Sequence, residues 1–259
     1  MNNPLSVFSF LFLFLALGGG SRAQKAPGFK KLVFPILQGD TVPYRLFIPA
    51  GDKETRFPLV IFLHGSGERG KDNERQLMNG VKNFATPKVQ KNHPCFILVP
   101  QCPQGQRWVN VDYSQKVIHQ PDTISVILGN VMLLVRDLIS RYPIDTTRIY
   151  ITGLSMGGFG TWDLITRYPS FFSAAVPICG GGDVKKAKLV KNVPVWAFHG
   201  AKDEVVRPEL SRAMVKAIEK AGGKPKYTEY PDLKHNCWDA TYKDPRVFRW
   251  LFSQSRLAE

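Results

Sequence analysis

Short apolar runs alternate with amphipathic segments along this chain, and the two patterns predict different elements. The run at 57–63 is apolar at every position, which is typical of a strand buried on both faces of a sheet. Strands are predicted at 32–37, 44–48, 57–63, 96–99, 148–152, 174–179, 194–200 and 226–231. Apolar residues at helical spacing predict helices at 124–139, 158–168 and 245–254, and 73–92 is expected to form a helix and a loop.

Strands that alternate with helices favour an α/β fold with a mostly parallel sheet and helices on both faces. The 259 residues show no internal repeat, low-complexity linker or second compositional block, so one domain over 24–259 is predicted. We find no insertion long enough for the large lid of an interfacial lipase and no propeller domain.

The first 23 residues have the features of a signal peptide. Residues 7–17 are apolar apart from Ser9, a stretch too short to span a bilayer. Small residues at Ser21 and Ala23 predict cleavage before Gln24 and a secreted or periplasmic protein without a stable membrane span. The alternative is a buried N-terminal helix, although this segment has no polar face.

The pentapeptide Gly153-Leu154-Ser155-Met156-Gly157 lies between a predicted strand and a predicted helix. A serine on such a sharp turn is the nucleophile elbow of α/β-hydrolases, and the flanking glycines allow close backbone approach. Ser155 is therefore the predicted nucleophile.

A serine nucleophile needs a base that an acid orients, and in this fold the order along the chain is serine, acid, histidine. Asp203 follows the strand at 194–200, and His235 follows the strand at 226–231. Because parallel strands end at one edge of the sheet, Ser155, Asp203 and His235 are predicted to meet there. Asp183, one strand too early, and Glu204, a predicted solvated loop charge, are the alternative acids.

The other four histidines have simpler explanations. His64 and His199 each precede a glycine at a strand end, where imidazoles commonly hydrogen-bond to nearby loops. His93 and His119 are in polar segments typical of the surface.

Two backbone N–H groups are expected to form an oxyanion hole. Met156 supplies one because it follows the nucleophile. The glycine-rich turn after the strand at 57–63 supplies the other, from Ser66 or, as the second choice, Gly67. An ordinary glycine turn is the alternative explanation.

Four cysteines are present, and export permits disulfides. Cys95 and Cys102 flank one strand, so their Cα atoms should lie about 23 Å apart, whereas a disulfide needs less than about 7 Å. Cys179–Cys237, Cys102–Cys179 and four free thiols all remain open. No paired cysteine or histidine spacing is typical of a metal site, and no motif requires a cofactor.

The net charge of +14 indicates attraction to anionic partners. Nucleic acid is not expected, since no basic-aromatic recognition motif is present. Acidic polysaccharide or a lipopolysaccharide surface suits an exported protein better, and a generally basic solvated surface is the simplest explanation. Four lysines cluster after Gly182, namely Lys185, Lys186, Lys188 and Lys191.

The segment 62–73, Phe-Leu-His-Gly-Ser-Gly-Glu-Arg-Gly-Lys-Asp-Asn, resembles the signature of a bacterial group of secreted or periplasmic carboxylesterases often labelled predicted peptidases. Further matching stretches lie at 99–103, 153–162, 177–183 and 235–242, so the resemblance covers nearly all of 34–251. This group is similar to feruloyl and acetyl-xylan esterases and to polyhydroxybutyrate depolymerases. The resemblance implies a single catalytic domain with Ser155, Asp203 and His235 as its triad.

We therefore expect a serine carboxylesterase that hydrolyses short-chain or aromatic acyl esters, free or linked to polysaccharide. Trp108 and Trp238 flank the expected cleft and are candidates for binding an aromatic acyl group or a sugar face, with packing beneath loops as the alternative. A small serine peptidase is the main rival within the enzyme class, and a non-catalytic glycan-binding protein is the rival from another class.

Overall fold

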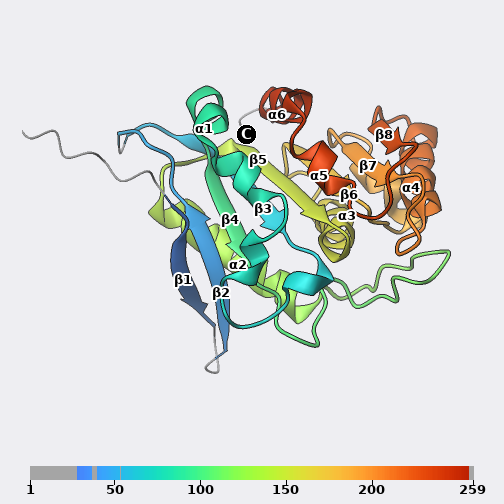
Figure 1. Cartoon of the computed structure of the whole chain (residues 1–259), viewed down its shortest axis with the longest axis horizontal. Coiled ribbons are helices and arrows are strands. Elements are labelled where there is room, and N and C mark those ends of the chain that lie inside the picture. The colour runs from blue at the N-terminus through green and yellow to red at the C-terminus, as the bar shows by residue number, and fades with distance from the viewer. Residues whose placement is uncertain (1–27, 37–39, 53, 257–259) are drawn as a thin grey trace, which may run out of the picture.

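The computed structural model describes residues 28–36, 40–52 and 54–256, and the predicted signal peptide at 1–23 lies outside them. Within these residues eight strands form one sheet in the order β1-β2-β4-β3-β5-β6-β7-β8 (Figure 1). β2 pairs antiparallel with both β1 and β4, and the remaining neighbours pair in parallel. This arrangement confirms the predicted α/β-hydrolase fold.

The eight predicted strands and the helices at 124–139, 158–168 and 245–254 are present, although the strand predicted at 148–152 begins at Ile144. The helices at 208–220 and 238–241 lie outside the predicted ones, and 73–92 forms two short turns and one helix at 87–92. The strands are β1 (Lys30–Pro35), β2 (Thr41–Phe47), β3 (Phe57–Leu63), β4 (Phe96–Pro100), β5 (Ile144–Leu154), β6 (Ala174–Ile178), β7 (Trp196–Gly200) and β8 (Lys226–Tyr230). The α-helices are α1 (Pro87–Asn92), α2 (Val126–Arg141), α3 (Met156–Arg167), α4 (Pro208–Lys220), α5 (Trp238–Thr241) and α6 (Pro245–Phe252). Short 3₁₀ turns are η2 (Ser66–Glu68), η3 (Arg75–Leu77), η4 (Val81–Ala85) and η5 (Val184–Val190).

The sheet has a hydrophobic core on each face, and β3 shows how the sequence builds both. Leu59, Ile61 and Leu63 contribute to the core beneath α2, α3 and α4. Val60 and Phe62, at the intervening positions, contribute to the core beneath η4, α5 and α6. Successive side chains of a strand point to opposite faces, so an uninterrupted apolar run fills two cores at once.

The parallel strands β3, β5, β6, β7 and β8 bring the loops that follow them to one edge of the sheet. The connection at 101–125, which contains no helix or strand, reaches the segment after β6, where the backbone N–H of Gln120 donates to Asp183. None of the helices in the described ranges is long and apolar enough to cross a membrane.

Candidate active site

Ser155 lies on the turn between β5 and α3, with φ 53° and ψ −120°. A non-glycine residue with positive φ is under backbone strain, which neighbouring contacts must offset. The Ser155 N–H donates to the Ile178 carbonyl (2.9 Å), and the Gly158 N–H donates to the Ser155 carbonyl (2.8 Å). The serine is therefore held by β6 on one side and by the first turn of α3 on the other.

The flanking glycines are required because backbone segments approach each other closely. A Cβ atom at Gly157 would lie 1.9 Å from the Leu63 carbonyl oxygen, and one at Gly153 would lie 2.4 Å from the Gly157 oxygen. Any side chain at these positions would push the elbow away from β3.

The structure brings Ser155, His235 and Asp203 together in one hydrogen-bonded series. The Ser155 hydroxyl donates to His235 Nε2 at 2.9 Å, and His235 Nδ1 donates to Asp203 Oδ2 at 2.7 Å. The Asp203 side chain is fully buried and the His235 side chain is 18% exposed. Nucleophile, base and acid thus have the distances that proton transfer requires.

Asp203 has a second histidine partner that the sequence interpretation missed. His199 Nε2 lies 3.1 Å from the same Oδ2 atom, and His199 Nδ1 lies 2.8 Å from the Ser211 hydroxyl. The other carboxylate oxygen accepts the backbone N–H groups of Val205 and Val206, each at 2.9 Å. His199 is the second-last residue of β7, four residues before Asp203. The sequence interpretation gave it only a hydrogen bond to a nearby loop, because the sequence does not show which side chain it would meet.

Hydrogen bonds and charge shift the pKa values of the acid and the base in opposite directions. Burial alone would raise the pKa of Asp203, but the hydrogen bonds from His199, His235 and Val206 hold it well below its usual range. Burial alone would lower the pKa of His235, but the hydrogen bonds and negative charge of its partners, Asp203 foremost, raise it to about 9. Asp203 is therefore ionised at neutral pH and favours the protonated form of His235.

The two alternative acids lie elsewhere. Asp183 is buried and accepts the backbone N–H groups of Gln120 and Lys185, so its carboxylate fixes two loops. Glu204 is largely exposed and pairs with Lys234 at 3.5 Å. Within the described residues neither carboxylate has a hydrogen bond to His235.

The expected oxyanion donors begin two helical segments. Met156 is the first residue of α3 and Ser66 the first residue of η2, and first-turn N–H groups have no acceptor within their own helix. The turn of Ser66 adjoins the nucleophile, since a Cβ added at Gly65 would lie 3.6 Å from Ser155 Cβ.

His64 holds the peptide that carries the Ser66 N–H. Its Nε2 accepts the Cys102 N–H (2.9 Å), which leaves the proton on Nδ1, and Nδ1 donates to the Gly65 carbonyl (2.6 Å). Burial lowers the pKa of His64 to about 4, so this neutral tautomer persists at neutral pH. Because C=O and N–H of a trans peptide point in opposite directions, fixing the Gly65 carbonyl also fixes the direction of the Ser66 N–H.

The two tryptophans differ from each other. The prediction that Trp108 flanks an open cleft is wrong, because Trp108 is fully buried and its indole N–H donates to the His64 carbonyl at 2.9 Å. Its role is packing beneath the loop. Trp238 is half-buried, and its ring meets the His235 ring edge to face at a centroid distance of 5.2 Å.

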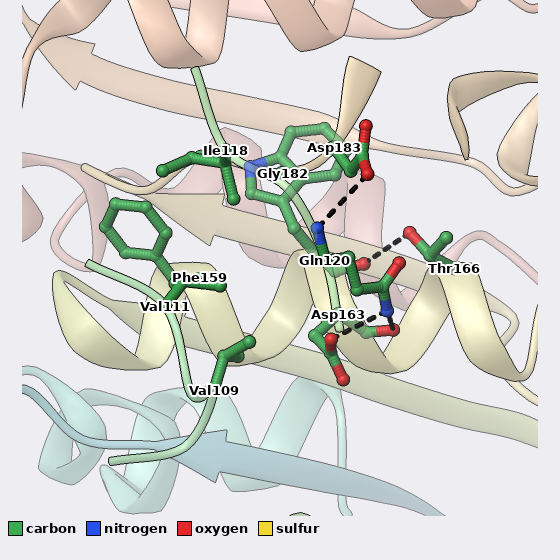
Figure 2. Close-up of a pocket in the computed structure, with 11 residues that line it drawn as sticks. Val109, Val111, Ile118, Gln120, Phe159, Asp163, Thr166, Gly182 and Asp183 are labelled. Atoms are coloured by element: carbon green, nitrogen blue, oxygen red, sulfur yellow. Dashed lines mark hydrogen bonds between the residues drawn. The ribbon is translucent and has the colours of Figure 1, made fainter. Parts of the chain in front are cut away.

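A small cavity lies between the 101–125 connection, α3 and the segment after β6 (Figure 2). Apolar side chains of Val109, Ile118 and Phe159 line one part of it, and the polar groups of Gln120 and Asp183 line another. Its volume of about 10 Å³ suits a single water molecule. Ser155, Asp203 and His235 do not line this cavity, so it is distinct from the candidate site.

Ligand atoms of Cys179, His199 and Asp203 lie within 4.8 Å of one another. Both nitrogens of His199 and both oxygens of Asp203 already have protein hydrogen-bond partners. We therefore interpret this group as part of the hydrogen-bond network around Asp203.

The chain has several curated relatives. A probable acetylxylan esterase A of Neosartorya fischeri is 25% identical over 83% of this chain and 57% of that protein. Poly(3-hydroxyalkanoate) depolymerase C of Paucimonas lemoignei is 28% identical over 52% of this chain and 30% of that protein. An uncharacterized secreted protein of Arthroderma benhamiae is 26% identical over 82% of this chain and 25% of that protein. The chain thus spans only part of the length of these relatives.

Solved structures and a family model also match this chain. A thermostable esterase superposes with a TM-score of 0.81 at 42% identity, covering 88% of this chain and 63% of that one. A ferulic acid esterase of Anaeromyces mucronatus shares the fold, with a TM-score of 0.61 at 13% identity over 86% of this chain and 90% of that one. The phospholipase/carboxylesterase family model matches residues 46–248. The chain therefore belongs to the phospholipase/carboxylesterase family of α/β-hydrolases.

Proposed function

We propose that the protein is a serine carboxylesterase that works through an acyl-enzyme on Ser155. The observation that carries the proposal is the continuous series Ser155–His235–Asp203, with hydrogen bonds of 2.9 and 2.7 Å. Met156 and Ser66 each begin a helical segment beside this series, so their N–H groups have no acceptor within that segment. Nucleophile, base, acid and anion-binding donors are the parts that acyl transfer needs.

In the first half of the reaction Ser155 Oγ attacks the ester carbonyl carbon while His235 Nε2 takes the hydroxyl proton. The carbonyl oxygen becomes an anion and accepts the Met156 and Ser66 N–H groups. As the intermediate collapses, the C–O bond to the alcohol breaks and His235 gives its proton to the departing oxygen. Asp203 keeps the proton of His235 on Nδ1 and stabilises the imidazolium.

In the second half water attacks the acyl-enzyme and His235 acts again as base and then as acid. Protonation of Ser155 Oγ releases the carboxylic acid and restores the free enzyme. Each proton that His235 accepts is returned within the same half-reaction, so no cofactor is needed for the balance.

We propose short-chain or aromatic acyl esters, including esters on polysaccharides, as the substrate class, with the protein secreted or periplasmic. Support comes from the acetylxylan esterase among its relatives and from the relative described as secreted. Trp238 beside His235 provides a flat apolar surface for an acyl or sugar ring.

Replacing the nucleophile tests the proposal. Ser155→Ala should lose about 10⁴-fold or more of kcat on an acetate ester while the protein keeps its circular dichroism spectrum. A phosphonate inhibitor should label wild-type Ser155 and leave the variant unlabelled. A folded Ser155→Ala protein with near wild-type activity would refute the proposal. Faster cleavage of a peptide amide than of the matching ester would favour the peptidase alternative.

A further inference from the structure

Two cysteines meet directly behind the candidate base. The Sγ atoms of Cys179 and Cys237 are 3.0 Å apart, although the residues are 58 positions apart in the chain. Both residues are fully buried. Of the three arrangements that the sequence left open, the fold places only this pair of sulfur atoms in contact within the described residues.

The backbones of both cysteines are held by neighbouring elements. Cys179 follows β6 with φ 49°, and its N–H donates to the Phe198 carbonyl of β7 at 2.9 Å. Cys237 precedes α5, and its carbonyl accepts the Thr241 N–H at 3.1 Å. The backbones of both cysteines are therefore held in place by neighbouring elements, with the two sulfur atoms in contact between them.

We propose that Cys179 and Cys237 form a disulfide when the protein folds in an oxidising compartment with a small-molecule disulfide as oxidant. One cysteine thiolate attacks the oxidant, which forms a mixed disulfide and releases one thiol. The other cysteine thiolate then attacks the protein sulfur of that mixed disulfide and releases the second thiol. Cys179 and Cys237 together lose two protons and two electrons, and the oxidant is reduced to two thiols.

The bond would join the end of β6 to the loop that carries His235. In the reduced state Cys179 Sγ donates to the His235 carbonyl at 3.1 Å, and oxidation removes the proton of that hydrogen bond. The covalent bond to Cys237, two residues after His235, would then hold the histidine loop in its place. The consequence for catalysis rests on the proposed function, whereas formation of the bond does not.

The folded structure indicates when the bond can form. Burial closes both sulfur atoms to solvent and raises the pKa of the Cys179 thiol well above its ordinary value. Oxidant therefore reaches the pair while the chain is still folding. Adding the oxidant to the folded, reduced protein would only measure whether it can reach the buried sulfur atoms. Refolding in the presence of the oxidant is therefore the informative experiment.

The full chain is denatured, reduced and refolded in a glutathione redox buffer, and its free thiols are counted after a second denaturation. The wild type should retain two of its four thiols, and peptide mapping should recover a Cys179–Cys237 linked pair. The melting temperature should be roughly 5 to 15 °C higher than that of protein refolded with a reductant, because a bond across a long loop restricts the unfolded chain.

Matched variants separate this pair from the other cysteines. Cys237→Ala should retain three thiols, and its melting temperature should be the same after refolding in redox buffer and after refolding with a reductant. Cys102→Ala should retain one thiol and show the same difference in melting temperature as the wild type. Ser155→Ala should form the bond as the wild type does, which distinguishes failure of this proposal from failure of the esterase assignment. Four thiols in correctly refolded wild type, or a bond to Cys95 or Cys102, would overturn the proposal.

Discussion

The pH dependence of ester hydrolysis should report directly on the contact between His235 and Asp203. Only neutral His235 can accept the proton of Ser155, and in the protein with reduced Cys179 the partners of His235, Asp203 and Cys179, raise its pKa from 6.5 to about 9. Below that pH kcat/KM on an uncharged ester should rise about tenfold per pH unit. Neutral pH should therefore lie on the rising part of this profile.

Asp203→Asn tests the cause of this shift. The neutral amide cannot stabilise the imidazolium, and burial then favours the uncharged ring. The acid limb, which is the part of the profile where kcat/KM rises with pH, should therefore shift to lower pH by roughly two units or more. The plateau should also fall, by up to about 10⁴-fold, because an amide no longer fixes the required tautomer. The pH position of the acid limb and the maximum value of kcat/KM therefore report on different effects. A variant that is only unstable would have a lower maximum and an unchanged pH position.

The assay measures the carboxylic acid released from a methyl ester by chromatography between pH 5 and 10, with subtraction of spontaneous hydrolysis. Asp183→Asn is the control and should keep the wild-type limb, since Asp183 has backbone partners away from the base. A wild-type profile that is flat from pH 6 to 9, or an Asp203→Asn limb at the wild-type position, would refute this reasoning.

The contact between His235 and Asp203 should also make the free energy of unfolding depend on pH. Because the pKa of His235 is raised on folding, its contribution to the free energy of unfolding is fully present below pH 6.5 and is lost as the pH rises through about 9. The melting temperature should therefore fall more between pH 6.5 and 9 in the wild type than in Asp203→Asn, as calorimetry would show.

Three further substitutions test the surroundings of the site. Gly157→Ala should destabilise the protein by at least about 3 kcal/mol in urea titrations, because its Cβ would clash with the Leu63 carbonyl. Gly129→Ala in α2 is the control and should be neutral or stabilising by up to about 1 kcal/mol. His199→Leu removes a donor to Asp203 and should move the acid limb up by roughly half to one pH unit, with His199→Gln closer to wild type; an unmoved limb would mean a packing role alone. Trp238→Ala should lower kcat/KM several-fold more on methyl ferulate than on methyl acetate, and equal losses would remove the aromatic acyl surface.

The sequence alone was sufficient to predict the fold and the order of the candidate site residues along the chain. The apolar run at 57–63 predicts a strand buried on both faces, and β3 supplies alternate residues to two cores. Ser155, Asp203 and His235 follow three parallel strands, β5, β7 and β8, and these positions predict that they meet, because parallel strands end at one edge. These inferences depend only on local periodicity and chain order.

Tertiary structure decided what individual side chains do at that edge. Trp108 and Trp238 look equivalent in sequence, yet one is fully buried under the loop and the other adjoins His235. His199 contacts the same carboxylate oxygen as His235, and Cys179 contacts Cys237, because β6 and β7 are neighbours and the histidine loop folds back over their ends. Periodicity determines which face a residue occupies, but its partners there come from segments far away in the chain, and only their packing selects them.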